Sequence, residues 1–164
     1  MPTTPSGHEF KAWQTDVAMR CNNRAWALSV QPRSAVEDRE MLDAAHTSAY
    51  HWAQVGTELN RMRATMLLAE VHAVLGHGAT AMSLATQMRD YFVRRNDTPD
   101  WELAFAHAIH AHCAHAAGNL AIHRAAYQEA VAALAAVADE EDREIVARTF
   151  NQVPAPLRAS GSDT

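Results

Sequence analysis

Turn residues recur in this 164-residue chain at a fixed spacing. Ser34, Gly76 and Gly118 follow one another at intervals of 42 residues, and stretches with helical spacing of apolar residues flank each of them. Each of the three is expected in the turn between two helices, and glycine is typical of helix ends. A unit repeated at a constant period predicts a stack of similar supersecondary elements. The spacing therefore favours successive helical hairpins.

Composition supports a helical fold. Hydrophobic residues make up 48% of the chain, and sixteen alanines fall between positions 104 and 138. Alanine has the highest helix propensity, and its small side chain lets neighbouring helices approach closely. No stretch shows the alternation of apolar and polar residues that marks a strand. We predict an all-α protein.

Turn and capping signals divide the chain into six long helices and a short seventh. The predicted ranges are 9–31, 34–55, 57–75, 79–94, 99–117 and 120–137, followed by 139–150. Ile145, Val146 and Phe150 predict that the last helix covers the apolar end of the stack. Segments 1–7 and 151–164 are rich in Pro, Ser, Thr and Gly, which predicts disordered tails around a single domain at 8–150.

Charge and motif content argue against several classes of protein. The net charge is −5 and no stripe of Lys or Arg occurs, so nucleic-acid binding is not expected. No run approaches 18 apolar residues, and the N-terminal segment does not read as a signal peptide, so we expect a cytoplasmic protein away from membranes. Cys21 and Cys113 form no CxxC motif, and whether they pair stays open. No catalytic motif is recognised, and we predict neither an enzyme nor a cofactor.

Alignment at the 42-residue period brings a family resemblance into view. It superimposes Ala25-Trp26-Ala27, Leu67-Leu68-Ala69 and Ile109-His110-Ala111. Further matching residues are Leu68, Ala69, His72, Gly76, Ala81 and Ala85 in the second unit, and His110, Ala111, Ala114, Gly118, Tyr127 and Ala130 in the third. Over roughly residues 18–137 this pattern resembles the tetratricopeptide repeat (TPR), although that family has a period of about 34. The resemblance implies a TPR-like right-handed stack of three antiparallel helical hairpins with a short C-terminal capping helix. An antiparallel helix bundle is the alternative.

The resemblance also implies a binding surface, because the first helix of each hairpin in such stacks lines a concave groove. By aligned position, the groove residues are Arg24, Leu28, Arg63, Met66, Glu70, Phe105, His112 and His115. The implied function is a non-enzymatic module that holds a peptide or a partner protein. A homodimer stays open as a further arrangement.

Two of these histidines suggest an alternative function. His112 and His115 are three residues apart and share one helical face, and the resemblance places Glu70 opposite His112 on the adjacent helix. Two imidazoles and a carboxylate suit zinc, or iron with open positions. The alternative is therefore a metal- or small-molecule-binding protein that uses Glu70, His112 and His115. Because ten histidines produce such a pair easily by chance, we do not predict a metal as the main reading.

His46, Tyr50 and Trp52 form a secondary candidate site. His46 and Tyr50 are four residues apart on one helical face, and Trp52 lies on another. They could supply an aromatic and imidazole wall for a ligand. The favoured interpretation is that Trp52 packs in the core while His46 and Tyr50 satisfy each other.

His107 and His110 fall where the family carries core residues. We therefore expect both to be held neutral, with pKa values below the usual value of about 6.5. Such groups lose stability as the pH falls, here between about pH 6.5 and 5.

Overall fold

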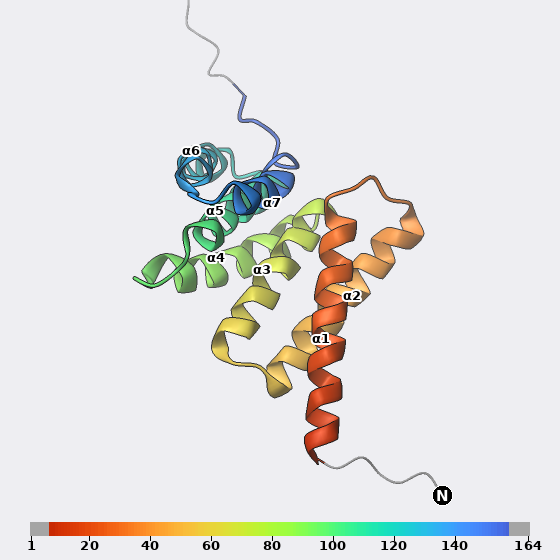
Figure 1. Ribbon diagram of the computed structural model, residues 1–164. Coiled ribbons are helices and arrows are strands. Elements are labelled where there is room, and N and C mark those ends of the chain that lie inside the picture. The colour runs from red at the N-terminus through yellow and green to blue at the C-terminus, as the bar shows by residue number, and fades with distance from the viewer. Residues whose placement is uncertain (1–6, 158–164) are drawn as a thin grey trace, which may run out of the picture.

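The computed structural model describes residues 7–157, which form seven helices and no strand (Figure 1). The helices are α1 (Gly7–Ser29), α2 (Ala35–Val55), α3 (Glu58–Val74), α4 (Gly78–Arg94), α5 (Asp100–Ala116), α6 (Leu120–Ala136) and α7 (Glu140–Phe150). The all-α prediction is confirmed, and each predicted helix end lies within two residues of the observed one. None of these helices combines the length and hydrophobicity needed to span a bilayer.

Side-chain caps fix where α2 and α3 begin. The Ser34 hydroxyl accepts a hydrogen bond from the Glu37 backbone N–H at 3.3 Å, and the Glu37 carboxylate accepts one from the Ser34 N–H at 2.8 Å. Thr57 and Asn60 exchange the same pair of hydrogen bonds at 3.3 and 3.0 Å. These capping boxes satisfy backbone donors that the first helical turn leaves without partners.

Two glycines end α3 and α5 in the same way. Gly76 and Gly118 have φ angles of +74° and +70°, a left-handed conformation that glycine adopts without a steric penalty. After Gly76, the His77 N–H donates to the His72 carbonyl at 2.8 Å. After Gly118, the Asn119 N–H donates to the Ala114 carbonyl at 2.9 Å. The spacing between Gly76 and Gly118 thus reflects two equivalent Schellman turns.

The turn between α1 and α2 has a different construction. It contains no glycine, and the Arg33 guanidinium donates to the carbonyls of Leu28 at 2.8 Å and Gln31 at 2.7 Å. Its Nε also binds the Asp38 carboxylate at 2.8 Å. Arg33 therefore takes over the carbonyl-capping role that the glycine turns perform elsewhere. Ser34 marks the start of α2, so the first unit is only partly equivalent to the other two.

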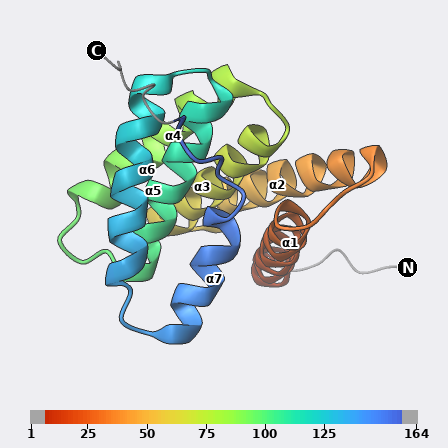
Figure 2. The same cartoon turned by 90° about the horizontal axis from the view of Figure 1, so that it is seen from above.

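Helices that follow one another in the chain pack as pairs. Each odd-numbered helix also contacts the next odd-numbered helix. The pairs are α1 with α2, α3 with α4 and α5 with α6, while α1, α3, α5 and α7 touch one another in chain order (Figure 2). One apolar cluster joins α3, α4, α5 and α7 around Met88, Phe92 and Ile109. A second joins α1, α2 and α3 around Leu28 and Met41. Helix α3 belongs to both clusters and ties the two halves together.

The C-terminal part of the described chain covers α5 and α6. Val146 of α7 is fully buried, and the ring centroids of Phe150 and Tyr127 lie 4.9 Å apart. Beyond α7, Val153 is buried, and the Pro154 carbonyl accepts a hydrogen bond from Nε2 of His123 at 2.8 Å. Within the predicted tail, residues 151–154 have partners: the N–H groups of 151–153 donate to carbonyls at the end of α7, and Val153 and the Pro154 carbonyl make the contacts just described. Residues 1–6 and 158–164 of the predicted tails lie outside the described range.

We predict that Gly76→Ala and Gly118→Ala each lower the free energy of unfolding by about 1 kcal/mol. No atom lies within 4 Å of a Cβ added at either position, so the cost arises from the positive φ alone. The Asn variants should lose less, because asparagine tolerates this conformation better. Urea denaturation of the four variants checks this. Equal stability of the Ala and Asn variants at both sites would contradict the role of the backbone angle.

Candidate functional site

A pocket of about 290 Å³ opens between α1, α3 and α5, with α7 at one side. We call it the α1/α3/α5 pocket. Its lining residues are Asn22, Asn23 and Trp26 of α1, Arg63, Met66 and Leu67 of α3, Trp101, Glu102, Phe105 and Ile109 of α5, and Ile145 of α7. The pocket therefore depends on the contacts that hold the odd-numbered helices side by side.

Aromatic rings and apolar side chains make up most of this lining. The Phe105 ring meets Trp26 edge-on, with centroids 5.0 Å apart, and meets Trp101 edge-on at 6.2 Å. Trp26 of α1 and Trp101 of α5 thus both pack edge-on against Phe105. Edge-to-face contacts fix the ring orientations, so the walls are defined before any ligand arrives.

One charge pair crosses the pocket between α3 and α5. Nε of Arg63 lies 2.5 Å from Oε1 of Glu102, and a second guanidinium nitrogen lies 3.3 Å from Oε2. The Glu102 side chain is only 2% exposed, whereas that of Arg63 is 41% exposed. The guanidinium also lies over the Trp101 ring, 5.6 Å from its centroid. Glu102 therefore anchors Arg63 from below, and the exposed side of Arg63 forms part of the pocket surface.

Amide side chains extend the pocket toward α2. A side pocket of about 230 Å³ shares Asn22, Asn23 and Arg63 with it. The further lining residues of the side pocket are Met19, Trp52 and Asn60. Within residues 7–157, the carboxamides of Asn22 and Asn23 have no hydrogen-bond partner, although both lie in mid-helix, where asparagine is unfavourable. Their donors and acceptors are available to a bound molecule.

The structure brings only part of the predicted groove together. Arg63, Met66 and Phe105 all line the α1/α3/α5 pocket. Arg24 and Leu28 are corrections: Arg24 lies on the outer side of the first helix pair, and Leu28 is fully buried in the core. The residue register holds for α3 and α5, which end in equivalent glycine turns. It fails for α1, which ends in the different turn around Arg33.

Glu70 and His112 do meet, but inside the protein. Nδ1 of His112 lies 2.9 and 3.1 Å from the two carboxylate oxygens of Glu70, and both residues are buried. Burial lowers the pKa of His112, but attraction and hydrogen bonding to the Glu70 carboxylate outweigh it and leave the pKa raised. The pair therefore joins α3 to α5 below the surface and does not line the pocket.

His115 does not join this pair. It is exposed at the end of α5, where its ring lies 5.0 Å from that of His123. Among residues 7–157, no group of three or more His, Cys, Asp or Glu side chains has an arrangement that could hold a metal ion. The alternative of a three-ligand site at Glu70, His112 and His115 is corrected accordingly, because the third side chain points elsewhere.

The secondary candidate residues face different neighbours. The His46 ring lies 5.5 Å from His72 of α3, and the Tyr50 ring lies 5.4 Å from His51. Trp52 is half-buried and lines the side pocket. Of the three, only Trp52 contributes to the candidate site.

Sequence reasoning missed Asn22, Asn23, Trp26 and Trp101. The two adjacent asparagines within a helical stretch were a usable signal, because such residues oppose helix formation without a compensating role. Trp26 aligned with core positions of the other units, and its contact with Phe105 depends on the rotation of α1, which the period does not specify. Trp101 lies one residue after the start of α5, where spacing does not decide which way a side chain points.

Comparisons with protein families, with curated proteins and with solved structures find no match to this chain. The geometry and chemistry of the pocket are therefore the basis for a proposed function.

His107 and His110 behave as the sequence predicted. Burial lowers the pKa of His107, despite the Glu129 carboxylate 3.1 Å from its Nδ1. Burial and the nearby Arg89 guanidinium lower the pKa of His110 to about 4. Nδ1 of His110 is buried and has no hydrogen-bond partner within the described residues. Both imidazoles are therefore neutral at pH 7.

The two kinds of histidine predict opposite pH effects. A histidine with a lowered folded pKa contributes stability above its unfolded pKa of about 6.5 and loses it as the pH falls toward the folded value. Protonation of His110 should thus lower the free energy of unfolding by on the order of 2 kcal/mol between about pH 6.5 and 4. The variant His110→Gln should lose less stability over the same pH range. His112, with a raised pKa, contributes below about pH 6.5 and loses this contribution as the pH rises. Thermal melts at each pH measure both, and an unchanged slope in His110→Gln would contradict the assignment.

The Arg63–Glu102 pair gives a second prediction. Arg63→Ala leaves a buried carboxylate without its cation and should destabilise the protein by about 3 kcal/mol at pH 7. Adding Glu102→Gln removes the buried charge and should recover at least half of that loss. Urea denaturation of the wild type, both single variants and the double variant gives the coupling. Additive losses would show that the two side chains act independently.

Proposed function

We propose that the protein is a TPR-like stack of helical hairpins that binds a peptide segment of a partner protein in the α1/α3/α5 pocket. The observation that carries this proposal is the pocket itself. It combines a preformed aromatic wall around Phe105 with the unpartnered amides of Asn22 and Asn23. The helical pairs and the serial contacts between odd-numbered helices support the TPR-like reading.

The chemistry of the lining favours a peptide as the ligand. Carboxamides both donate and accept hydrogen bonds, so Asn22 and Asn23 match the alternating N–H and C=O groups of an extended backbone. The apolar floor around Met66 and Ile109 suits an inserted aliphatic or aromatic side chain. Arg63 and Glu102 neutralise each other, so no strong charge on the peptide is required.

The volume of the pocket agrees with a peptide that inserts one side chain and continues across the surface. A volume of about 290 Å³ is at or below the lower end of the range of small-molecule sites, roughly 300–1,000 Å³, and accommodates one large side chain of a peptide. The side pocket continues past Asn22 and Asn23 toward Trp52, so the chain on one side of the anchor can follow it. The proposed ligand is therefore a short extended segment with one buried apolar residue.

The proposal predicts that peptides selected from a random library bind with micromolar dissociation constants and depend on the pocket. Trp101→Ala removes one wall and should weaken binding at least about tenfold. The paired change Asn22→Ala and Asn23→Ala removes the amides without touching the core and should weaken binding by about threefold to tenfold. Fluorescence anisotropy with labelled peptides measures both effects.

Gln128→Ala is the matched control, because this amide is exposed on α6, away from the pocket. Thermal melts identify any variant that loses its fold. If Trp101→Ala unfolds, the paired asparagine variant still tests the pocket. Failure to select any peptide, or equal binding by the pocket variants and the control, would refute the proposal.

A further inference from the structure

The two ends of the helix stack are covered differently. At the C-terminal end, α7 and Val153 pack over α5 and α6. At the N-terminal end, α1 and α2 pack against α3 with one side only, through Leu28, Met41 and Ala45. Within residues 7–157, no further helix packs over the opposite side of this pair. We call that side the outer α1/α2 face.

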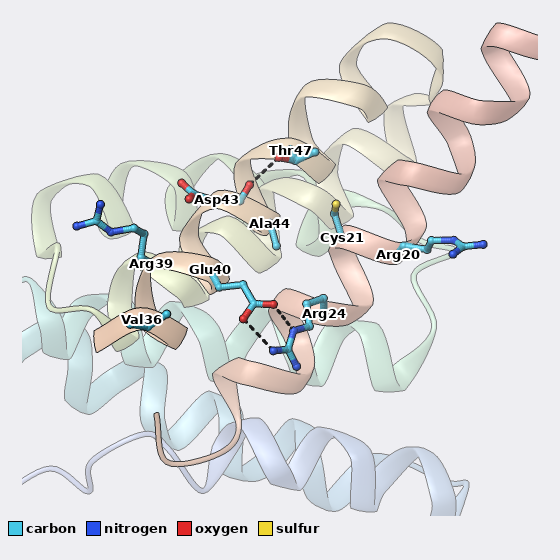
Figure 3. Close-up of a pocket in the computed structure, with 9 residues that line it drawn as sticks. All are labelled: Arg20, Cys21, Arg24, Val36, Arg39, Glu40, Asp43, Ala44 and Thr47. Atoms are coloured by element: carbon cyan, nitrogen blue, oxygen red, sulfur yellow. Dashed lines mark hydrogen bonds and ion pairs between the residues drawn. The ribbon is translucent and has the colours of Figure 1, made fainter. Parts of the chain in front are cut away.

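Helical spacing shows which residues share this face. A hollow of about 590 Å³ separates Cys21 and Arg24 of α1 from a row on α2 that starts at Val36 and ends at Thr47 (Figure 3). The same side of α1 continues to Phe10 and Trp13, the latter seven residues, or about two turns, before Arg20. On α2 it continues to Tyr50, three residues after Thr47. The ring centroids of Trp13 and His51 lie 5.5 Å apart, so the aromatic segments of α1 and α2 lie side by side. The face therefore runs along both helices.

Large apolar side chains are concentrated on the outer α1/α2 face. Phe10, Trp13, Val36 and Tyr50 are 51%, 54%, 77% and 64% exposed. They are four of the ten exposed large hydrophobic residues in the described chain. Solvated single residues need no explanation, but a row of them beside a hollow is typical of an interaction surface.

The same face carries charges of both signs, and only some of them are paired. Arg24 and Glu40 pair across the hollow at 2.6 and 2.9 Å. Arg39 and the Asp43 carboxylate, one helical turn apart on α2, have no ion-pair partner among residues 7–157 (Figure 3). A strongly acidic partner would repel Asp43, and a strongly basic partner would repel Arg39. A partner surface that carries one charge of each sign could pair with both.

We propose that the outer α1/α2 face binds a second copy of this chain, forming a two-fold dimer in which α2 packs antiparallel to its equivalent. In a two-fold interface the same patch occurs on both sides and must be self-complementary. With the axis level with Met41, Arg39 of each copy faces Asp43 of the other. The Val36 side chains then enter the hollow from both sides, and four helices form a bundle.

The size of the face suits a weak to moderate dimer. Helices of 23 and 21 residues give a surface about 30 Å long and about 20 Å wide. About 600 Å² per copy is at the lower end of specific interfaces. We therefore expect dissociation constants in the micromolar range, with monomer and dimer in exchange.

Sedimentation velocity between about 1 and 300 µM tests the proposal, because this concentration range brackets micromolar affinity. Reducing buffer prevents Cys21 from crosslinking copies. The expected result is a rise from 18.0 kDa toward twice that mass. A protein that is monomeric throughout this range overturns the proposal and leaves the face to another partner.

Charge exchange tests the pairing. Arg39→Asp places like charges opposite each other and should weaken the dimer at least about tenfold, and adding Asp43→Arg should restore it to within about threefold. Val36→Glu should weaken it comparably, whereas Val93→Glu, a matched change on α4, should not. If neither Arg39→Asp nor Val36→Glu changes the dissociation constant of the dimer, the interface does not lie on this face. If the double variant does not recover dimer formation, the antiparallel arrangement is wrong. Trp101→Ala should leave the dimer intact, which separates this test from peptide binding.

Discussion

Helix α5 can contact four other helices only because its side chains are small. It packs against α3, α4, α6 and α7, and five of its alanines are almost completely buried: Ala104, Ala106, Ala108, Ala111 and Ala114. Helix axes approach to 8–10 Å depending on the side chains between them, and a larger residue at any of these positions would separate the layers. The walls of the pocket follow from this spacing, because Trp101 and Phe105 project from the one face of α5 that neighbouring helices leave partly open.

Close packing by alanine buries little apolar area per residue, and two buried carboxylates add polar links at the same contact. Glu70 pairs with His112, and Glu102 pairs with Arg63, so that each end of the α3–α5 contact has one acid and one base. A buried charge needs its partner, so both pairs favour a single alignment of the two helices over a shifted one. The pocket inherits this alignment, since Met66 of α3 and Ile109 of α5 must lie opposite each other to form its floor.

The sequence predicted the helices well because their ends depend on local chemistry. Ser34, Thr57, Gly76 and Gly118 each determine a cap or turn through atoms a few residues away, and all of them lie at predicted breaks between helices. The candidate site was predicted in part. Arg63, Met66 and Phe105 lie in the pocket because α3 and α5 share equivalent turns, so a common register transfers between them.

Residues of α1 could not be placed from the period. The Arg33 turn replaces the glycine turn there, and the rotation of α1 about its axis is decided by packing of Leu28 and Trp26 against partners far along the chain. The position of the His115 ring beside His123, and the hydrogen bond from His123 to the Pro154 carbonyl, likewise depend on packing that no local pattern encodes.

The order of packing has a consequence for how the protein folds and opens. Most helix contacts join elements no more than two places apart in the chain, and the Trp26–Phe105 contact between α1 and α5 is an exception. Such short-range contacts close small loops and favour rapid folding. They also let an end of the stack detach without disturbing the rest. The α1–α2 pair is joined to the remainder mainly through α3, so it forms a natural unit of local unfolding. Amide hydrogens in α1 and α2 should therefore exchange with solvent sooner than those in α5, which is held from four directions.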